Sequence, residues 1–215
     1  MNTIYPTYEI ETELHSAGYL QVAGVDECAR GTLWGSVVAA AVYIPSENVP
    51  KLINKVHDSK KLTSKKRDEL SELIKDTCFY GIGEIGPDVV DDINILRATE
   101  QAMALALSKL QLDFEINYDY VLIDGTVKLP MVVQQQKQII KGDSKVLSIA
   151  AASIVAKAYR DNKILNMPDL DYYNIWDIGN SKGYGTKKHL AAIKEYGLSD
   201  LHRKTFGICR EYTYE

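Results

Sequence analysis

An apolar run that ends in two adjacent acids constrains the fold of this chain more than any other feature. The run starts at Val22 and reaches Asp26 and Glu27, and the small or basic segment 28–31 follows at once. Acidic residues are depleted from strand interiors and are costly to bury without a partner. A divalent metal ion would remove that cost, because hard cations bind carboxylate oxygens. The alternative is a strand end whose two acids simply face water.

The two acids cannot play equal parts in such a site. Neighbouring residues of a strand point to opposite faces of the sheet. Both carboxylates reach one metal only if the strand bends or ends between them. We therefore expect Asp26 to be the central ligand and Glu27 to be more peripheral.

Composition narrows the class of protein. The chain has 215 residues, of which 46% are hydrophobic and 25% charged, as in ordinary globular domains. No apolar run approaches the ~20 residues of a membrane span, and the acidic N-terminal segment lacks the apolar stretch of a signal peptide. The three cysteines lack a CxxC spacing, which indicates reduced thiols in the cytoplasm. The net charge of −4 excludes a uniformly basic surface but leaves room for local basic patches.

The periodicity of apolar residues predicts an α/β fold. The first two strands, 19–27 and 33–44, are joined by a short glycine-containing segment, which favours an antiparallel pair. Strands followed by alternating helices and strands indicate a mixed sheet covered by helices. The further expected strands are 79–85, 120–123 and 132–140, and the expected helices are 9–17, 64–77 (with Ser64 as a candidate cap), 87–112, 144–163, 186–196 and 198–205.

Two further acids stand at the ends of expected elements. Asp124 ends the strand 120–123, and Asp143 precedes the alanine-rich helix. Acids brought together from separate elements repel one another unless a metal or a proton intervenes. Each also has a plain explanation, because Asp124-Gly125 could be only a turn and Asp143 only a helix cap.

Two basic segments could contact nucleic acid. Residues 57–67 place five basic side chains and three hydroxyls against one acid at a helix start, which suits phosphate, although a solvated helix start is the alternative. In the segment 182–189, Tyr184 lies between two glycines and beside lysines. An exposed ring there could stack on a base or sugar, whereas a packed tyrosine in a glycine-rich loop is the alternative.

Taken together, the order of these motifs closely resembles the ribonuclease HII family, over roughly residues 19–206. The motifs that carry the resemblance are GVDECARG, DSKKLTSKKRDEL, Asp124-Gly125, KGDSKVLSIAAASIVAKAYRD, GYGTKKHL and LHRKTF. The resemblance implies a ribonuclease H-like fold with a catalytic core at 1–168 and a helical C-terminal extension at 169–215, packed as one unit. It also implies a monomeric enzyme that needs Mg²⁺ or Mn²⁺.

The implied activity is two-metal-ion cleavage of the RNA strand of RNA–DNA hybrids, and of ribonucleotides embedded in duplex DNA, leaving 5′-phosphate and 3′-hydroxyl ends. The resemblance assigns catalysis and metal binding to Asp26, Glu27, Asp124 and Asp143. It assigns phosphate contacts to the segment 58–62, with Ser59, Lys60 and Lys61, the RNA–DNA junction to Tyr184, and the ribose 2′-hydroxyl to the loop Ala29-Arg30-Gly31.

The chain departs from the family in that loop, where Ala29 replaces the first glycine of a Gly-Arg-Gly motif. Alanine restricts positive φ angles and close backbone approach, so we expect altered discrimination of a single embedded ribonucleotide. Two rival interpretations remain: a different two-metal nuclease of the same fold, and a non-catalytic hybrid-binding homologue.

Overall fold

A mixed five-stranded sheet forms the centre of the molecule. The computed structural model describes residues 5–57 and 59–213. The strands are β1 (Val22–Cys28), β2 (Val37–Tyr43), β3 (Phe79–Ile85), β4 (Tyr120–Asp124) and β5 (Gln135–Ile139), in the spatial order β3-β2-β1-β4-β5. β2 pairs antiparallel with β1 and β3, whereas β1–β4 and β4–β5 are parallel. The predicted mixed sheet, with its antiparallel first pair, is confirmed.

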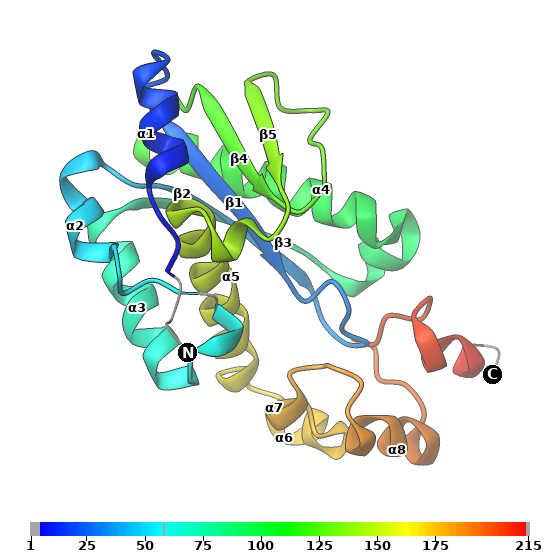
Figure 1. Cartoon of the computed structure of the whole chain (residues 1–215). Helices are drawn as coiled ribbons and strands as arrows, with labels where there is room; N and C mark the ends of the chain where they lie inside the picture. Colours follow the sequence, from blue (N-terminus) through cyan, green and yellow to red (C-terminus); the bar gives the residue numbers. More distant parts are fainter. Residues whose placement is uncertain (1–4, 58, 214–215) are drawn as a thin grey trace.

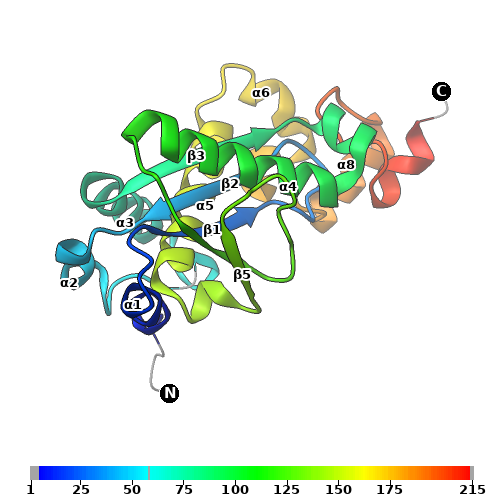
Figure 2. The same cartoon turned by 90° about the horizontal axis from the view of Figure 1, so that it is seen from above.

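Helices cover both faces of this sheet (Figures 1 and 2). Helix α4 (Pro87–Phe114) packs on one face, and α5 (Leu147–Leu165) with α3 (Ser64–Thr77) packs on the other. Strand β2 contributes alternate residues to each side: Ala39 and Ala41 join the core under α4, and Val38 and Ala40 join the core under α5. A strand buried on both faces has no polar alternation, which explains the continuous apolar run in the sequence.

The close packing of α4 on β3 depends on two glycines. A Cβ atom at Gly81 would lie 2.1 Å from the carbonyl oxygen of Ala106, and one at Gly83 would lie 1.9 Å from that of Ala102. Since no side chain fits there, the glycines of this strand allow the helix backbone to rest directly on the sheet.

Helix α4 is interrupted where the sequence predicted a continuous helix. Asn94 has a left-handed φ of 68°, and its side-chain oxygen accepts hydrogen bonds from the backbone N–H groups of Leu96 (3.0 Å) and Arg97 (3.2 Å). Asparagine tolerates this conformation, so it ends one helical segment and caps the next. In α3 the cap is Thr63, not the expected Ser64, because Thr63 Oγ1 accepts from the N–H of Lys66.

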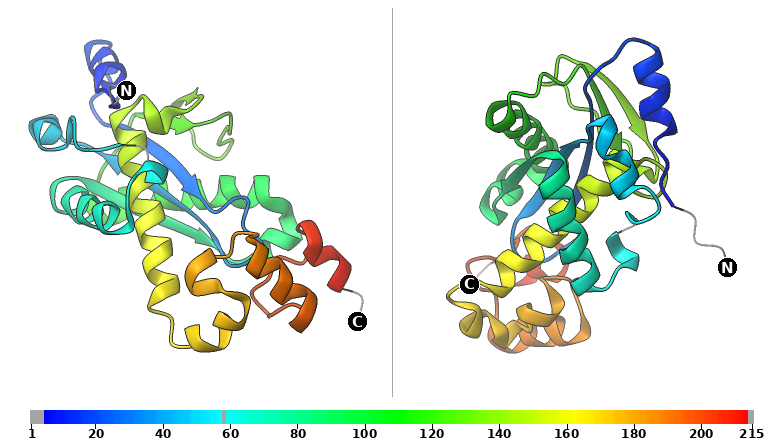
Figure 3. Two further views of the ribbon diagram at one scale, coloured as in Figure 1. Left: turned by 60° about the horizontal axis from the view of Figure 1, so that its bottom comes forward. Right: turned by 90° about the vertical axis from the view of Figure 1, so that its left-hand side faces the viewer.

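The remaining helices lie around the sheet, and a C-terminal group lies beyond one of its ends (Figure 3). Trp34 from the β1–β2 loop packs into the core of that group with Trp176 and Ile193. Among the described residues, no helix combines the length and apolar character needed to cross a lipid bilayer. The remaining α-helices are α1 (Glu9–Ser16), α2 (Val49–Leu52), α6 (Leu170–Tyr173), α7 (Ile178–Ser181) and α8 (Lys187–Tyr196), and the 3₁₀ turns are Ser46–Asn48, Ser59–Lys61, Gly142–Ser144, Asn174–Trp176 and Gly207–Tyr212.

The helix predicted at 198–205 is wrong. The segment runs alongside the β1–β2 loop: the N–H of Arg203 donates to the carbonyl of Leu33 (2.8 Å), and the N–H of Gly35 donates to that of Leu201 (2.9 Å). Trp34 and His202 form an antiparallel bridge between the two segments. These long-range backbone bonds replace the local bonds that a helix would have made.

Candidate active site

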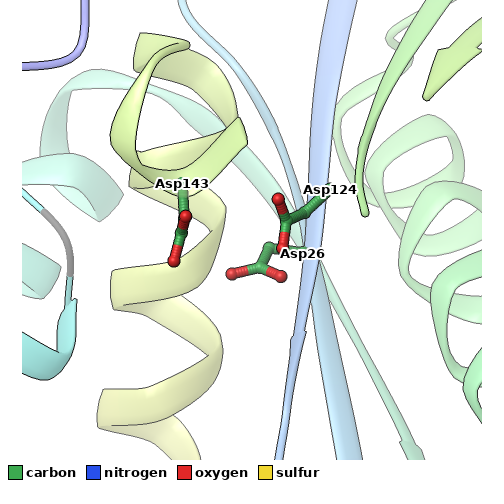
Figure 4. Close-up of side chains that lie close together, drawn as sticks. All are labelled: Asp26, Asp124 and Asp143. Atoms are coloured by element: carbon green, nitrogen blue, oxygen red, sulfur yellow. The ribbon is translucent and has the colours of Figure 1, made fainter. Parts of the chain in front are cut away.

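Parallel pairing brings two acids together at the carboxyl ends of β1 and β4. The register pairs Val25 with Ile123, so Asp26 and Asp124 occupy the next position on neighbouring strands. Side chains at paired positions point to the same face of a sheet. Figure 4 shows the carboxylates of Asp26 and Asp124 facing the region beside α5.

Asp143 approaches these two acids from the other side of that region (Figure 4). It lies in the 3₁₀ turn that leads into α5. The N–H of the preceding residue, Gly142, donates a 2.6 Å hydrogen bond to Asp124 Oδ1 and so ties this turn to the end of β4. One carboxylate oxygen from each of Asp26, Asp124 and Asp143 lies within 4.8 Å of the others.

Glu27 lies outside this group of three acids. Its carboxylate contacts Arg30 Nη1 at 3.3 Å. The alternation of side chains along β1 separates Glu27 from Asp26, as the strand geometry leads one to expect.

The acid group carries an unfavourable charge that a cation would relieve. Asp26 is only 3% exposed. Burial, followed by the charges of Glu27 and Asp124, raises the pKa of Asp26 well above its ordinary value. Burial and the neighbouring Asp143 likewise raise the pKa of Asp124. Three crowded carboxylates, which supply only oxygen ligands, fit a hard divalent cation such as Mg²⁺ or Mn²⁺.

The segment before α3 anchors one side of the site. Ser59 is buried, and its hydroxyl lies 2.9 Å from that of Ser153 on α5, which itself hydrogen-bonds to Asp26. Lys60 Nζ lies 3.4 Å from Asp143 Oδ2, and Lys61 is exposed. Position 58, the first residue of the segment assigned to phosphate contacts, lies outside the described residues. Of Ser59, Lys60 and Lys61, only the two lysines therefore reach the surface. Ser59 instead supports the acid group from the interior of the protein, through Ser153.

The loop after the acid pair adopts the conformation that its sequence makes unfavourable. Ala29 is buried with a left-handed φ of 66°, and Arg30 and Gly31 are exposed. Arg203 Nη1 donates to the carbonyl of Arg30 at 3.0 Å, and Thr32 Oγ1 donates to that of Ala29 at 3.1 Å. The surrounding contacts thus hold a backbone shape that glycine would adopt without strain.

Ala29→Gly is expected to stabilise the protein by about 1 kcal/mol, because it removes the steric cost of a left-handed alanine. The gain should appear as a higher urea midpoint with an unchanged slope. Ala17→Gly, at the end of α1 where φ is −83°, is the matched control and should not stabilise. A destabilised Ala29→Gly protein would contradict this expectation, because the lost methyl contacts and the greater freedom of glycine in the unfolded chain would then outweigh the relief of strain.

Tyr184 lies close to that loop and half faces solvent. Its side chain is 40% exposed, and the ammonium of Lys157 lies 5.4 Å from the centre of its ring. The N–H of Leu33 donates to the carbonyl of Gly183 at 2.8 Å, which joins the two loops. Tyr184 and the loop 29–31 are therefore brought side by side, although 153 positions separate Gly31 from Tyr184 in the sequence.

Sequence reasoning missed two residues that contact the predicted ones. Ser153 and Lys157 are one helical turn apart on α5, and they contact Asp26 and Tyr184 respectively. Their spacing of four residues, after Asp143 at the helix start, is the signal that could have identified them.

Comparisons with known proteins agree with this geometry. The sequence matches the ribonuclease HII family over residues 23–209. It is 44% identical to the ribonuclease HII of Chlamydia abortus over 203 residues (94% of this chain, 91% of that protein) and 46% identical to that of Geotalea daltonii over 205 residues (95% and 90%). The fold is similar to the crystal structure of ribonuclease H2 from Pyrococcus horikoshii, with a TM-score of 0.71 at 24% identity, covering 90% of this chain and 97% of that one.

Proposed function

Since the chain belongs to the ribonuclease HII family, we propose that it hydrolyses RNA by a two-metal-ion mechanism and cuts at ribonucleotides embedded in duplex DNA. Membership of the family makes the protein a ribonuclease H, an endonuclease that cleaves RNA in RNA–DNA hybrids. The observation that carries the proposed mechanism is the group of three carboxylates, each contributing an oxygen within 4.8 Å of the others.

The acids hold the metal and set the charge of the site. Asp26, Asp124 and Asp143 would bind Mg²⁺ or Mn²⁺, and Glu27 would join them by turning away from Arg30. Held by these acids, divalent ions would supply Lewis-acid activation of the attacking water and stabilisation of the leaving 3′-oxygen, the chemistry that leaves a 5′-phosphate and a 3′-hydroxyl. Ser153 holds Asp26 in place by donating a hydrogen bond to its carboxylate. Lys60 offsets part of the charge on Asp143 and is suitably placed for a phosphate.

Substrate recognition is proposed for the two neighbouring loops. Backbone groups of Ala29, Arg30 and Gly31 would approach the 2′-hydroxyl, by which a protein distinguishes RNA from DNA. The ring of Tyr184 would stack at the RNA–DNA junction, and Lys61 would contact phosphate. The C-terminal extension from residue 169 onward would keep these loops in register with the acids. The protein would act as a monomer, because every proposed contact comes from one chain.

Cleavage-site mapping tests this proposal. One duplex carries a single ribonucleotide in DNA and the other carries a run of ribonucleotides, and both are incubated with Mg²⁺, with Mn²⁺ or with chelator. We expect metal-dependent cuts in both duplexes, leaving 5′-phosphates. Cleavage of the run but not of the single ribonucleotide would refute embedded-ribonucleotide cutting.

A non-catalytic hybrid-binding role is the alternative that Ala29 raises. A binder has no need to crowd three repelling carboxylates, two of them buried, beside the phosphates that it binds, which argues against this role. Binding of both duplexes without cleavage in either metal would establish it.

A further inference from the structure

Two buried histidines of the C-terminal extension form a direct ring-to-ring hydrogen bond. His189 Nε2 lies 3.0 Å from His202 Nε2, and neither ring is exposed. His189 Nδ1 lies 2.9 Å from the carbonyl oxygen of Tyr184. At the other end, His202 Nδ1 accepts the backbone N–H of Ser199 at 2.9 Å. The pair therefore links the backbone at Ser199 to the backbone at Tyr184.

The partners of these rings permit only one arrangement of protons. A carbonyl oxygen can only accept, so His189 carries its proton on Nδ1 and leaves Nε2 bare. A bare His189 Nε2 needs a donor, so His202 carries its proton on Nε2. His202 Nδ1 is then bare, which is what the N–H of Ser199 requires. Each neutral ring thus donates once, and both donations run toward Tyr184.

The position of the Tyr184 ring depends on the hydrogen bonds that hold the backbone carbonyl of the same residue. This carbonyl accepts from His189 Nδ1 and also from the N–H of Thr186 at 2.8 Å. The flanking Gly183 has a positive φ of 82°, a conformation that glycine adopts without strain. At the far end, Trp34 Nε1 donates to Ser199 Oγ at 3.2 Å, which ties the network to the β1–β2 loop. The network therefore connects both loops that we assign to the substrate.

We propose that His189 and His202 are positioning residues for substrate binding: through their hydrogen-bonded pair they fix the Tyr184 carbonyl, and so the Tyr184 ring, against the β1–β2 loop. This inference rests on the proposed substrate role of Tyr184. Neither histidine touches the acid group, so their effect falls on recognition of the duplex and leaves the chemical step unchanged.

The proton arrangement is tested first, on the full chain without substrate. Imidazole ¹⁵N shifts at pH 7.5 distinguish the two neutral tautomers of histidine. We expect His189 to be protonated on Nδ1 and His202 on Nε2. The opposite tautomer on either ring would overturn the relay.

A double-mutant cycle tests the coupling to Tyr184. Tyr184→Ala is expected to raise KM for the single-ribonucleotide duplex about tenfold, as the loss of one stacked base predicts. His202→Phe keeps a planar ring but donates no hydrogen bond, and should raise KM about threefold or more with kcat unchanged. In the Tyr184→Ala background His202→Phe should have no further effect on KM, because the ring that it positions is already gone.

Two further variants separate positioning from folding. His202→Gln retains a side-chain N–H donor near the place of Nε2, so it should restore most of the wild-type KM. Tyr173→Phe removes a hydroxyl that donates to Asp200 at 3.0 Å in the same extension, and should lower the melting temperature without raising KM. If His202→Phe raises KM equally in the wild-type and Tyr184→Ala backgrounds, and the wild-type enzyme cleaves, the positioning role is overturned while the proposed function stands. Absence of cleavage by the wild-type chain instead refutes the proposed function.

Discussion

Asp26→Asn is expected to lower the cleavage rate by about a thousandfold or more while making the metal-free protein more stable. Asn keeps the shape of Asp and an oxygen that can accept from the N–H of Glu27, a bond of 2.7 Å in the wild type. The substitution removes a buried carboxylate, whose pKa is raised by burial and by two neighbouring carboxylates. In a chain of this size, each ~1 kcal/mol of such relief corresponds to a rise of about 2–4 °C in melting temperature. Single-turnover cleavage and thermal melting in EDTA at pH 8 measure the two effects.

Adding Mn²⁺ should reverse the order of the two melting temperatures. A ligand that binds only the folded state at ~100 times its Kd stabilises that state by about 2.7 kcal/mol. The wild type gains this stabilisation, and Asp26→Asn, which lacks a central carboxylate, gains much less. The same buried charge that destabilises the metal-free protein is thus what makes the site bind a cation.

Glu69→Gln is the matched control for this pair of measurements. Glu69 is an exposed acid on α3 whose carboxylate pairs with Lys66 at 3.3 Å, remote from the acid group. It should change neither the rate nor the response to Mn²⁺. Near-normal turnover of Asp26→Asn, or an equal response of both proteins to Mn²⁺, would contradict a metal-binding role for Asp26.

Local sequence patterns predicted the parts of the fold that local physics determines. The strand 79–85 and the helix 64–77 have the predicted bounds, because each is set by its own periodicity and flanking residues. The sequence placed Asp26 and Asp124 at strand ends, but only the family resemblance implied that they meet; the parallel pairing of β1 with β4, which brings them together, was not predicted. Asp143 was recognisable by its place before the alanine-rich helix.

Features that depend on distant partners could not be predicted in this way. The segment 198–205 has apolar residues at helical spacing, but the backbone of the β1–β2 loop competes for its hydrogen bonds. The burial of Ser59 depends on Ser153, which comes 94 positions later. The left-handed φ of Ala29 is likewise imposed by contacts from Arg203 and from the loop itself. The family resemblance implied the role of that loop, whereas its strained backbone at Ala29 is explained only by the packing contacts in the structure.

His189 and His202 make the folded protein less stable at low pH, whereas the acid group has the opposite effect. Burial, then the adjacent His189, lowers the pKa of His202 to about 4, and burial lowers that of His189. The unfolded chain takes up protons on these rings below about pH 6.5, whereas the folded chain does not. Stability from the histidines is therefore present above pH 6.5 and is lost as the pH falls toward 4. The raised pKa values of Asp26 and Asp124 act in the other direction, because the folded state binds their protons more tightly.

A comparison of the wild type with His202→Gln isolates the histidine contribution, because the acid group contributes equally to both proteins. The pKa of His202 is about 4 in the folded chain and about 6.5 in the unfolded chain. This difference predicts that the free energy of unfolding of the wild type falls by about 2 kcal/mol between pH 7.5 and pH 5 through His202 alone. Gln does not titrate, so the free energies of unfolding of the two proteins should converge by about that amount over this range. Urea unfolding at pH 7.5, 6 and 5 measures the convergence. Parallel profiles would mean that His202 is protonated as readily in the fold as in the unfolded chain, which a ring facing the N–H of Ser199 cannot accommodate without breaking that bond.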